Sequence, residues 1–269
     1  DIFYRELISN GCDAITKLKK LDMMGEYSLP ADYKAKIQVI VNPEEKTLTF
    51  IDNGLGMTAD EVEEYINQIA FSGATDFIEK YKDKSNDDQI IGHFGLGFYS
   101  AFMVAKKVTV ISRAQGEDTA WKWESTGVEG YTLTETDKDD VGTEIILVMK
   151  DDTDTDHYSE YLEDYEITNL VKKYSDYIRF PITMYREKSR QKPKPEDAGD
   201  DYKPEYETYT ELETLNSMVP IWKRPKSEVK DEDYNEFYKN KFMDYTDPLR
   251  VITLSLIHIS EPTRPRLIS

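Results

Sequence analysis

Four polar residues near the start of the chain are spaced so that a single helix face would carry all of them. These residues are Glu6, Asn10, Asp13 and Lys17. At 100° per residue their positions fall within an arc of about 60° at the margin of the apolar face. Two carboxylates, a carboxamide and an amine would then line the cleft where the helix leaves the core. The alternative is a solvated helix flank with an ion pair from Asp13 to Lys17, so the stripe alone decides nothing.

Two loops rich in glycine offer a complementary kind of chemistry. The run from Asp52 to Met57 reads DNGLGM, and it places a carboxylate at a strand end before two glycines. A ligand can therefore reach both a side chain and bare backbone, although an ordinary capped turn fits equally well. The run from Gly92 to Phe98 reads GHFGLGF directly before a helix, where free amides and the helix dipole attract phosphate. Its glycine order differs from the Rossmann loop, and no P-loop motif is present.

Hydrophobic periodicity and turn residues predict the elements that position these groups. Residues 1–21 keep a helical period, and residues 36–41 and 46–51 read as a strand hairpin. A capping box at Thr58 to Glu61 predicts a helix directly afterwards. The remaining expected elements are a helical segment at 98–105, an antiparallel meander of strands at 108–113, 119–124, 131–136 and 143–150, a helix at 158–177 and an edge strand at 182–185. This order predicts an α+β fold, a two-layer α/β sandwich whose mixed, mostly antiparallel sheet is covered by helices on one face.

Composition shifts predict the domain organisation. We expect a first domain at 1–186, a charged linker at 187–210 and the beginning of a second domain at 211–253. The chain starts within a helical pattern, so we expect a fragment whose first domain is truncated at its start. Residues 254–269 resemble a translated sequencing adapter, and we expect a non-native tail there.

Charge and composition exclude several classes of function. The net charge of −19 repels a phosphate backbone, so we expect no nucleic acid partner. No apolar run reaches the length of a membrane span, so we expect no membrane partner. Cys12 is the single cysteine, which suits a reducing cytoplasm and a small buried side chain. Three histidines and one cysteine leave little for a zinc site.

Taken together, the motifs resemble one known nucleotide site in order and spacing. They are the helix with Glu6 to Asn10, the loop from Asp52 to Met57, the run from Gly92 to Ser100 and the pair Gly142-Thr143. This combination resembles the ATPase shared by gyrase, histidine kinases, MutL and the heat-shock protein 90 chaperones. The runs RELISN, GLGFYSAFMVA and WKRP resemble the heat-shock protein 90 family in particular, and within it the bacterial high-temperature protein G type, over nearly all of residues 1–253.

The resemblance implies a role for each matching residue, with ATP and Mg²⁺ as cofactors. Glu6 corresponds to the general base that activates water, and Asn10 to the ligand that holds Mg²⁺ against the phosphates. Asp52 corresponds to the carboxylate that accepts a hydrogen bond from the adenine amine, supported by Thr143. Residues 67–97 would form a lid over the nucleotide. The complete ATP-binding set implied in this way is Asn10, Asp13, Ala14, Asp52, Gly56, Met57, Asn67, Phe71, Gly95, Gly97, Phe98 and Thr143.

The resemblance also implies an ATP-dependent molecular chaperone of the stress response, with client proteins as partners and a homodimer in the full-length family. One position departs from the family pattern, because Phe71 stands where many members have a lysine that reaches phosphate. The arginine that completes hydrolysis in the family comes from the middle domain, so we expect the fragment to be a nearly inactive ATPase. The alternatives are a nucleotide-binding interaction module without turnover and a histidine kinase ATPase domain. A histidine kinase needs a phosphoacceptor histidine, and none precedes residue 93.

Overall fold

The computed structural model describes residues 1–67, 97–127, 130–192, 206–225, 227–242 and 244–252. The chain divides into two compact units, Asp1–Met218 and Val219–Ser269. The expected lid, apart from its end residues 67 and 97, lies outside the described residues. The first five positions of the second glycine-rich run, 92–96, and the expected tail also lie outside them.

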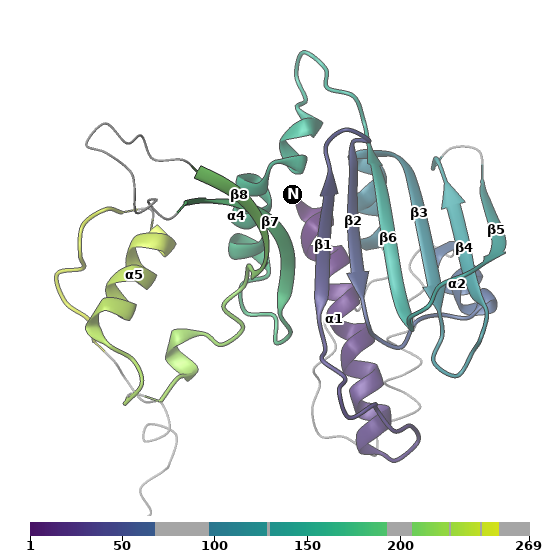
Figure 1. Cartoon of the computed structure of the whole chain (residues 1–269), viewed down its shortest axis with the longest axis horizontal. Coiled ribbons are helices and arrows are strands. Elements are labelled where there is room, and N and C mark those ends of the chain that lie inside the picture. Colours follow the sequence, from purple (N-terminus) through teal and green to yellow (C-terminus); the bar gives the residue numbers. More distant parts are fainter. Residues whose placement is uncertain (68–96, 128–129, 193–205, 226, 243, 253–269) are drawn as a thin grey trace, which may run out of the picture. The chain divides into compact units, whose positions relative to one another are not determined.

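The first unit is built on one eight-stranded sheet with the strand order β5-β4-β3-β6-β2-β1-β7-β8 (Figure 1). The described strands are β1 (Ile37–Asn42), β2 (Thr47–Asp52), β3 (Ala105–Arg113), β4 (Ala120–Ser125), β5 (Tyr131–Thr136), β6 (Gly142–Met149), β7 (Ile182–Gln191) and β8 (Tyr206–Thr214). Neighbouring strands are antiparallel except β1 and β7, which are parallel. The sheet is therefore mixed and mostly antiparallel, as the sequence predicts.

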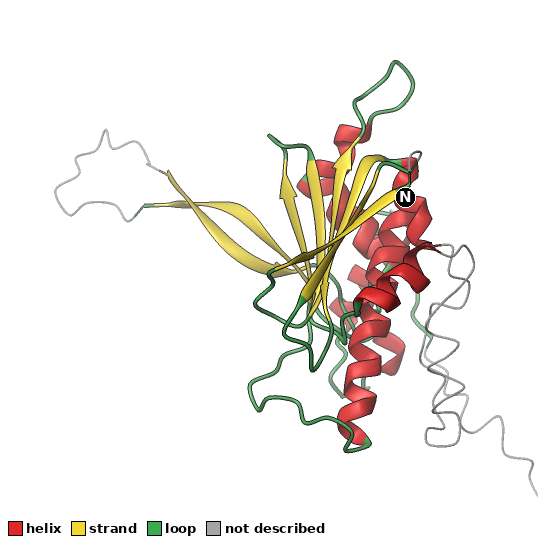
Figure 2. Ribbon diagram, turned by 90° about the vertical axis from the view of Figure 1, so that its right-hand side faces the viewer, coloured by secondary structure: helices red, strands yellow, loops and turns green. Residues whose placement is uncertain are grey.

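Helices cover one face of this sheet, which Figure 2 shows nearly edge-on. The described helices of the first unit are α1 (Ile2–Met23), α2 (Ala59–Asn67), α4 (Asp164–Tyr174) and the 3₁₀ helices η1 (Gly97–Met103) and η2 (Tyr158–Leu162). The expected two-layer α+β sandwich is confirmed. Among the described residues, no helix is both long and apolar enough to cross a membrane.

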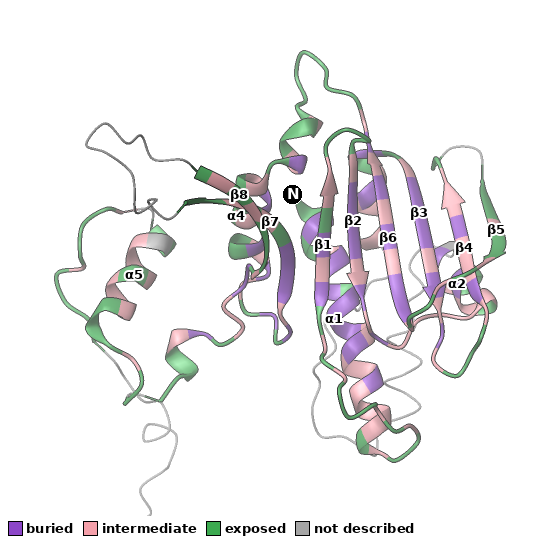
Figure 3. Cartoon of the chain, in the orientation of Figure 1, coloured by how far each residue is buried: buried purple, intermediate pink, exposed green. Residues whose placement is uncertain are grey.

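The core lies between α1 and the covered face of the sheet, where the buried positions of Figure 3 concentrate. The apolar side chains that α1 buries recur with helical spacing: Phe3, Tyr4, Leu7, Ile8, Cys12, Ile15 and Leu18. Tyr4 meets Phe50 of β2 edge to face, with ring centroids 5.0 Å apart. Burying a large apolar side chain contributes about 1.5–3 kcal/mol, so this stripe fixes which side of α1 remains available for ligands.

The local signals in the first third of the chain are confirmed. Residues expected to form a hairpin pair as β1 and β2, with Val39 opposite Phe50. The capping box is also present, because the amide of Glu61 donates to Oγ1 of Thr58 at 3.3 Å and the amide of Thr58 donates to Oε2 of Glu61 at 2.8 Å. Both hydrogen bonds satisfy amides that the first turn of a helix leaves without partners.

Three expectations differ from the structure. The expected meander of four strands is wrong in its last step, because β6 pairs with β3 and β2 instead of β5. The expected helix at 158–177 is interrupted at Glu163, whose backbone is extended, whereas the expected helical segment at 98–105 is present as the 3₁₀ helix η1. The strand that begins at Ile182 is not an edge strand, because β8 pairs with its outer side. Because β6 lies in the interior of the sheet, alternate side chains along its whole length are buried.

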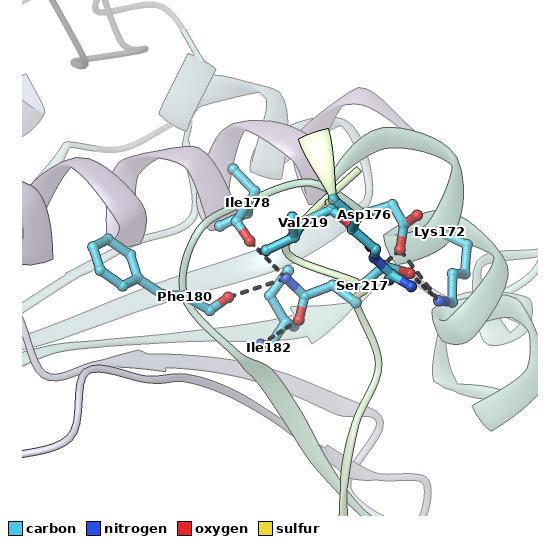
Figure 4. A network of polar contacts seen from close by, with 9 residues as sticks. Lys172, Asp176, Ile178, Phe180, Ile182, Ser217 and Val219 are labelled. Atoms are coloured by element: carbon cyan, nitrogen blue, oxygen red, sulfur yellow. Dashed lines mark hydrogen bonds and ion pairs between the residues drawn. The ribbon is translucent and has the colours of Figure 1, made fainter. Parts of the chain in front are cut away.

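The end of the first unit is tied to the sheet by a polar network. The side chain of Asn216, which is buried, accepts from the amide of Ile182 at 2.8 Å and donates to the carbonyl oxygens of Ile178 and Phe180. Figure 4 shows the adjacent contacts, in which Asp176 and Lys172 bind Ser217.

Strands β7 and β8 extend into the range 187–210 that the sequence assigns to a linker. They pair from Thr183 with Thr214 to Gln191 with Tyr206. The domain boundaries drawn from the sequence stay a prediction.

The second unit contains the 3₁₀ helix η3 (Ile221–Lys223) and the helix α5 (Asp231–Phe242). The rings of Trp222 and Phe237 meet edge to face, with centroids 6.0 Å apart. Trp222 nevertheless stays largely exposed, as do Phe242 and Tyr245.

Candidate functional site

A buried carboxylate lies beneath the middle of α1. Asp52 ends β2 and is only 8% exposed. A methyl group added to Gly11 of α1 would lie 3.2 Å from Cβ of Asp52 and 3.6 Å from its Oδ2. The other oxygen, Oδ1, accepts a hydrogen bond from the amide of Gly54 at 2.9 Å. A glycine in the helix thus allows α1 to approach the carboxylate closely.

Burial raises the pKa of Asp52 from 3.8 to about 7. The opposing influences are weaker: hydrogen bonds from the amides of Gly54 and Thr143 and the charge of Lys138 favour the ionised form. A carboxylate that lacks enough donors in its own protein gains most from a ligand that supplies one. Asp52 is therefore suited to accept a hydrogen bond from a bound N–H group.

Asp52 belongs to a row of polar side chains that crosses three neighbouring strands. Asp52 pairs with Thr143 of β6, and Thr143 pairs with Ser112 of β3, so all three point to the same face of the sheet. The hydroxyl groups of Ser112 and Thr143 lie 2.8 Å apart, and the amide of Met57 donates to Oγ of Ser112 at 2.9 Å. The adjacent row consists of Phe50, Ile145 and Val110 and is apolar.

Sequence reasoning missed Ser112, although β3 contains a signal that could have indicated it. Val108 and Val110 point into the core, and the next residue of that alternation is Ser112, which is fully buried. A hydroxyl at a core position needs a partner. That partner could not be named before the register of β3 against β6 was known.

The loop after Asp52 is held by close backbone contacts. A methyl group added to Gly54 would lie 2.5 Å from the carbonyl carbon of Ala14 on α1. Gly56 has a φ of +69°, and a methyl group there would collide with the carbonyl oxygen of Arg113. The amide of Leu55 also donates to the carbonyl of Ala14 at 3.2 Å. Both glycines are therefore required for the loop to lie between α1 and the end of β3.

A second carboxylate lies about one and a half turns before Gly11 on α1. Oε1 of Glu6 accepts from the guanidinium of the adjacent Arg5, at 2.6 Å from Nη2 and 3.0 Å from Nε. The other oxygen, Oε2, is the atom that a methyl group on Gly97 would strike first. The Glu6 carboxylate thus lies against the first residue of η1. Asn10, one turn further along α1, is exposed, whereas Asp13 is buried.

Aromatic contacts fix the start of η1. Phe98 packs edge to face against Trp123 of β4, with ring centroids 5.8 Å apart. The hydroxyl of Tyr99 donates to the carbonyl oxygen of Ile66 in α2. These contacts position Gly97 beside Glu6 through packing on two other elements.

The structure brings most of the expected site residues to one region of the covered sheet face. Those in described positions are Glu6, Asn10, Asp13, Ala14, Asp52, Gly56, Met57, Gly97, Phe98 and Thr143. Asn67 ends α2, while Phe71 and Gly95 lie outside the described residues. In the described part of the chain, no group of three or more His, Cys, Asp or Glu side chains could hold a metal ion. The role of each site residue stays a prediction.

Comparison with known proteins identifies the class to which this fold and site belong. The family described as histidine kinase-, DNA gyrase B- and HSP90-like ATPase matches residues 4–155, which contain nearly all of α1 and the whole of β2, β3 and β6. The chain belongs to this family of ATPases. Membership of this family implies that the chain binds a nucleotide.

Further matches narrow the class to the chaperone branch. The family described as Hsp90 protein matches residues 160–206 and 196–257. The chain is 48% identical over 259 residues to the Chaperone protein HtpG of Clostridium perfringens and 46% identical over 255 residues to that of Alkaliphilus oremlandii. It is 44% identical over 256 residues to the HtpG of Bacillus subtilis. Each comparison covers 95% of the chain and 40% of the relative.

These matches confirm the resemblance to the heat-shock protein 90 family and favour it over the alternatives considered from the sequence. The Hsp90 match lies downstream of the ATPase match.

Proposed function

We propose that residues 1–218 bind an adenine nucleotide, with Asp52 accepting a hydrogen bond from the adenine amine. The observation that carries this proposal is the buried Asp52 carboxylate directly beneath Gly11 of α1. Glu6 lies five residues earlier on the same helix, which is about 7.5 Å along the helix axis. A ligand that binds Asp52 at one end can therefore extend along α1 towards Glu6 and Gly97. Ala14, Gly56, Met57 and Phe98 would contact the ligand between these ends.

Glu6 is the proposed general base of ATP hydrolysis. Arg5 occupies its Oε1, while Oε2 faces Gly97 and is the oxygen that would accept a proton from the attacking water. Asn10 fits the requirements of Mg²⁺, which keeps several waters and needs few protein oxygens beside the phosphates. Bound there, Mg²⁺ would neutralise charge on the phosphates. The exposed carboxamide of Asn10 would orient it, one turn from Glu6.

We propose that the whole protein is an ATP-dependent molecular chaperone that acts on client proteins as a homodimer. Support comes from the Hsp90 match and from the relatives named Chaperone protein HtpG. The chain spans 40% of the length of these relatives, so dimerisation and client binding would depend on more than the described residues. The single cysteine, Cys12, supports a reducing compartment such as the cytoplasm.

We further propose that residues 1–269 bind ATP but hydrolyse it slowly. Charge that develops on the transferred phosphate needs a cation, typically an arginine, for fast turnover. Arg5 is a cation beside the general base, but it already forms an ion pair with Glu6. Phe71 also replaces the lysine that many family members have at that position.

Parallel measurements of nucleotide binding and of ATP hydrolysis test the role proposed for Glu6. Glu6→Ala should bind Mg-ADP within about twofold of the parent chain, because Glu6 is assigned to water and not to the adenine end. In a full-length relative, the equivalent change should lower hydrolysis by about 10² to 10⁴, the usual effect of removing a general base. Glu63→Ala, on the exposed side of α2, is the matched control and should change neither the affinity for Mg-ADP nor the rate of ATP hydrolysis. Full hydrolysis by the Glu6→Ala relative would exclude Glu6 as the base.

A further inference from the structure

The hydroxyl of Ser112 has a defined set of partners. Ser112 is 0% exposed, so water does not reach it. Its oxygen accepts from the amide of Met57 at 2.9 Å and lies 2.8 Å from Oγ1 of Thr143. A second acceptor for its proton, the carbonyl oxygen of Gly142, is farther away at 3.4 Å.

The lengths of these contacts favour one arrangement of the hydroxyl protons. The amide of Met57 can only donate, so it uses a lone pair of Ser112. Ser112 can then donate its proton to Oγ1 of Thr143 at 2.8 Å or to the carbonyl oxygen of Gly142 at 3.4 Å, and the shorter contact is the stronger hydrogen bond. Donation to Thr143 occupies a lone pair of that oxygen and leaves the Thr143 proton free to point towards a ligand.

We propose that Ser112 is a positioning residue that makes Thr143 a hydrogen-bond donor and thereby sets the base specificity of the site. This inference rests on the proposed binding of an adenine nucleotide. The order of donation runs from the Met57 amide to Ser112, from Ser112 to Thr143 and from Thr143 to the base, directly or through one water.

The polar row then presents an acceptor beside a donor. Asp52, when ionised, only accepts, and Thr143 donates. The edge of adenine offers a donor, the exocyclic amine, beside an acceptor, ring nitrogen N1, and therefore matches this order. Guanine and hypoxanthine offer a carbonyl oxygen beside a ring N–H, which is the reverse order. Binding of guanine or hypoxanthine would leave buried polar groups of the site without partners, so the site rejects these bases strongly.

An analogue of ADP in which N1 is replaced by C–H tests the proposal by isothermal titration calorimetry on the complete chain. The parent should bind this analogue about three- to tenfold more weakly than ADP, the usual worth of one neutral hydrogen bond. In Ser112→Ala and in Thr143→Val, this penalty should shrink to less than about twofold. In Ser175→Ala, which removes a hydroxyl from another buried serine at the end of α4, the penalty should remain. If Ser112 had only a structural role, Ser112→Ala would lower the affinities for ADP and for the analogue by the same factor.

Several outcomes would overturn the proposal. If the parent bound ADP and the analogue with equal affinity, the proposal would be wrong whatever the variants showed. It would also be wrong if Ser112→Ala lost as much affinity for the analogue, relative to ADP, as the parent does. If Ser112→Ala does not fold, Ser112→Cys replaces the hydroxyl with a weaker S–H donor, and a full penalty there would contradict the inference. Failure of the parent to bind ADP at all would instead refute the proposed function.

Discussion

Replacing Asp52 with asparagine should separate ligand binding from stability. The amide side chain turns a donor towards the adenine amine and loses the charge-assisted hydrogen bond, which contributes about 1.5–3 kcal/mol. With the unfavourable donor included, we expect a loss of about 2–3 kcal/mol, or an affinity for Mg-ADP that is about 30- to 150-fold lower. The fold should remain, because Oδ1 of an asparagine can still accept from the amide of Gly54.

The same substitution should stabilise the ligand-free protein at high pH. The folded-state pKa of Asp52 is about 7 against 3.8 for an ordinary aspartate, so the folded protein retains a proton that the unfolded chain loses between these values. The free energy of unfolding therefore falls as the pH rises through this window, by about 4 kcal/mol in total. The substituted asparagine does not titrate, although its buried NH₂ group costs about 1–3 kcal/mol. The net gain of about 1–3 kcal/mol above pH 8 should raise the melting temperature by several degrees.

Calorimetric titration and thermal unfolding from about pH 4 to pH 8 are the assays. The affinity of the parent for Mg-ADP should rise about tenfold from pH 6 to pH 8 as Asp52 ionises, and Asp52→Asn should lack this rise. Asp118→Asn, at an exposed position before β4, is the matched control. Binding of Mg-ADP by Asp52→Asn within threefold of the parent would refute the adenine assignment. A lower melting temperature than the parent at pH 8 would refute the account of a destabilising buried charge.

Two further predictions concern glycines at close approaches. In a full-length relative, Gly97→Ala should reduce ATP hydrolysis at least tenfold while changing ADP affinity little, because the new methyl group displaces Oε2 of Glu6. Steady-state measurements of ATP hydrolysis test this prediction. Unchanged hydrolysis would contradict the position of Glu6. Gly54→Ala should destabilise the chain by about 1–3 kcal/mol, because its methyl group overlaps the backbone of Ala14. Gly116→Ala is the comparison in thermal unfolding: its methyl group meets nothing within 4 Å, and its cost is the strain of a positive φ, which Gly54 does not have. An effect of Gly54→Ala no larger than that of Gly116→Ala would contradict the close contact with α1.

The elements that depend on local signals could be predicted from the sequence. Helix α1 follows from its apolar period, the β1–β2 hairpin from two β-rich runs around a polar turn, and α2 from a capping box that the structure contains. Each signal acts within a few residues, so tertiary contacts do not override it.

Non-local pairing explains what could not be predicted. The insertion of β6 between β2 and β3 depends on contacts about 30 to 100 positions apart in sequence, for which the chain contains no local signal. Ser112 joins Asp52 and Thr143 only through that register. The close approach of Gly97 to Glu6 likewise depends on aromatic packing between η1 and β4.

The most direct test of the central claim is a calorimetric titration of the complete chain with Mg-ATP and, separately, with Mg-GTP. We expect one ATP per chain and an affinity for GTP at least tenfold lower, because Asp52 and Thr143 oppose the carbonyl and ring N–H of guanine. No saturable binding of ATP, or equal binding of the two nucleotides, would contradict the assignment of α1 and the polar row as an adenine nucleotide site.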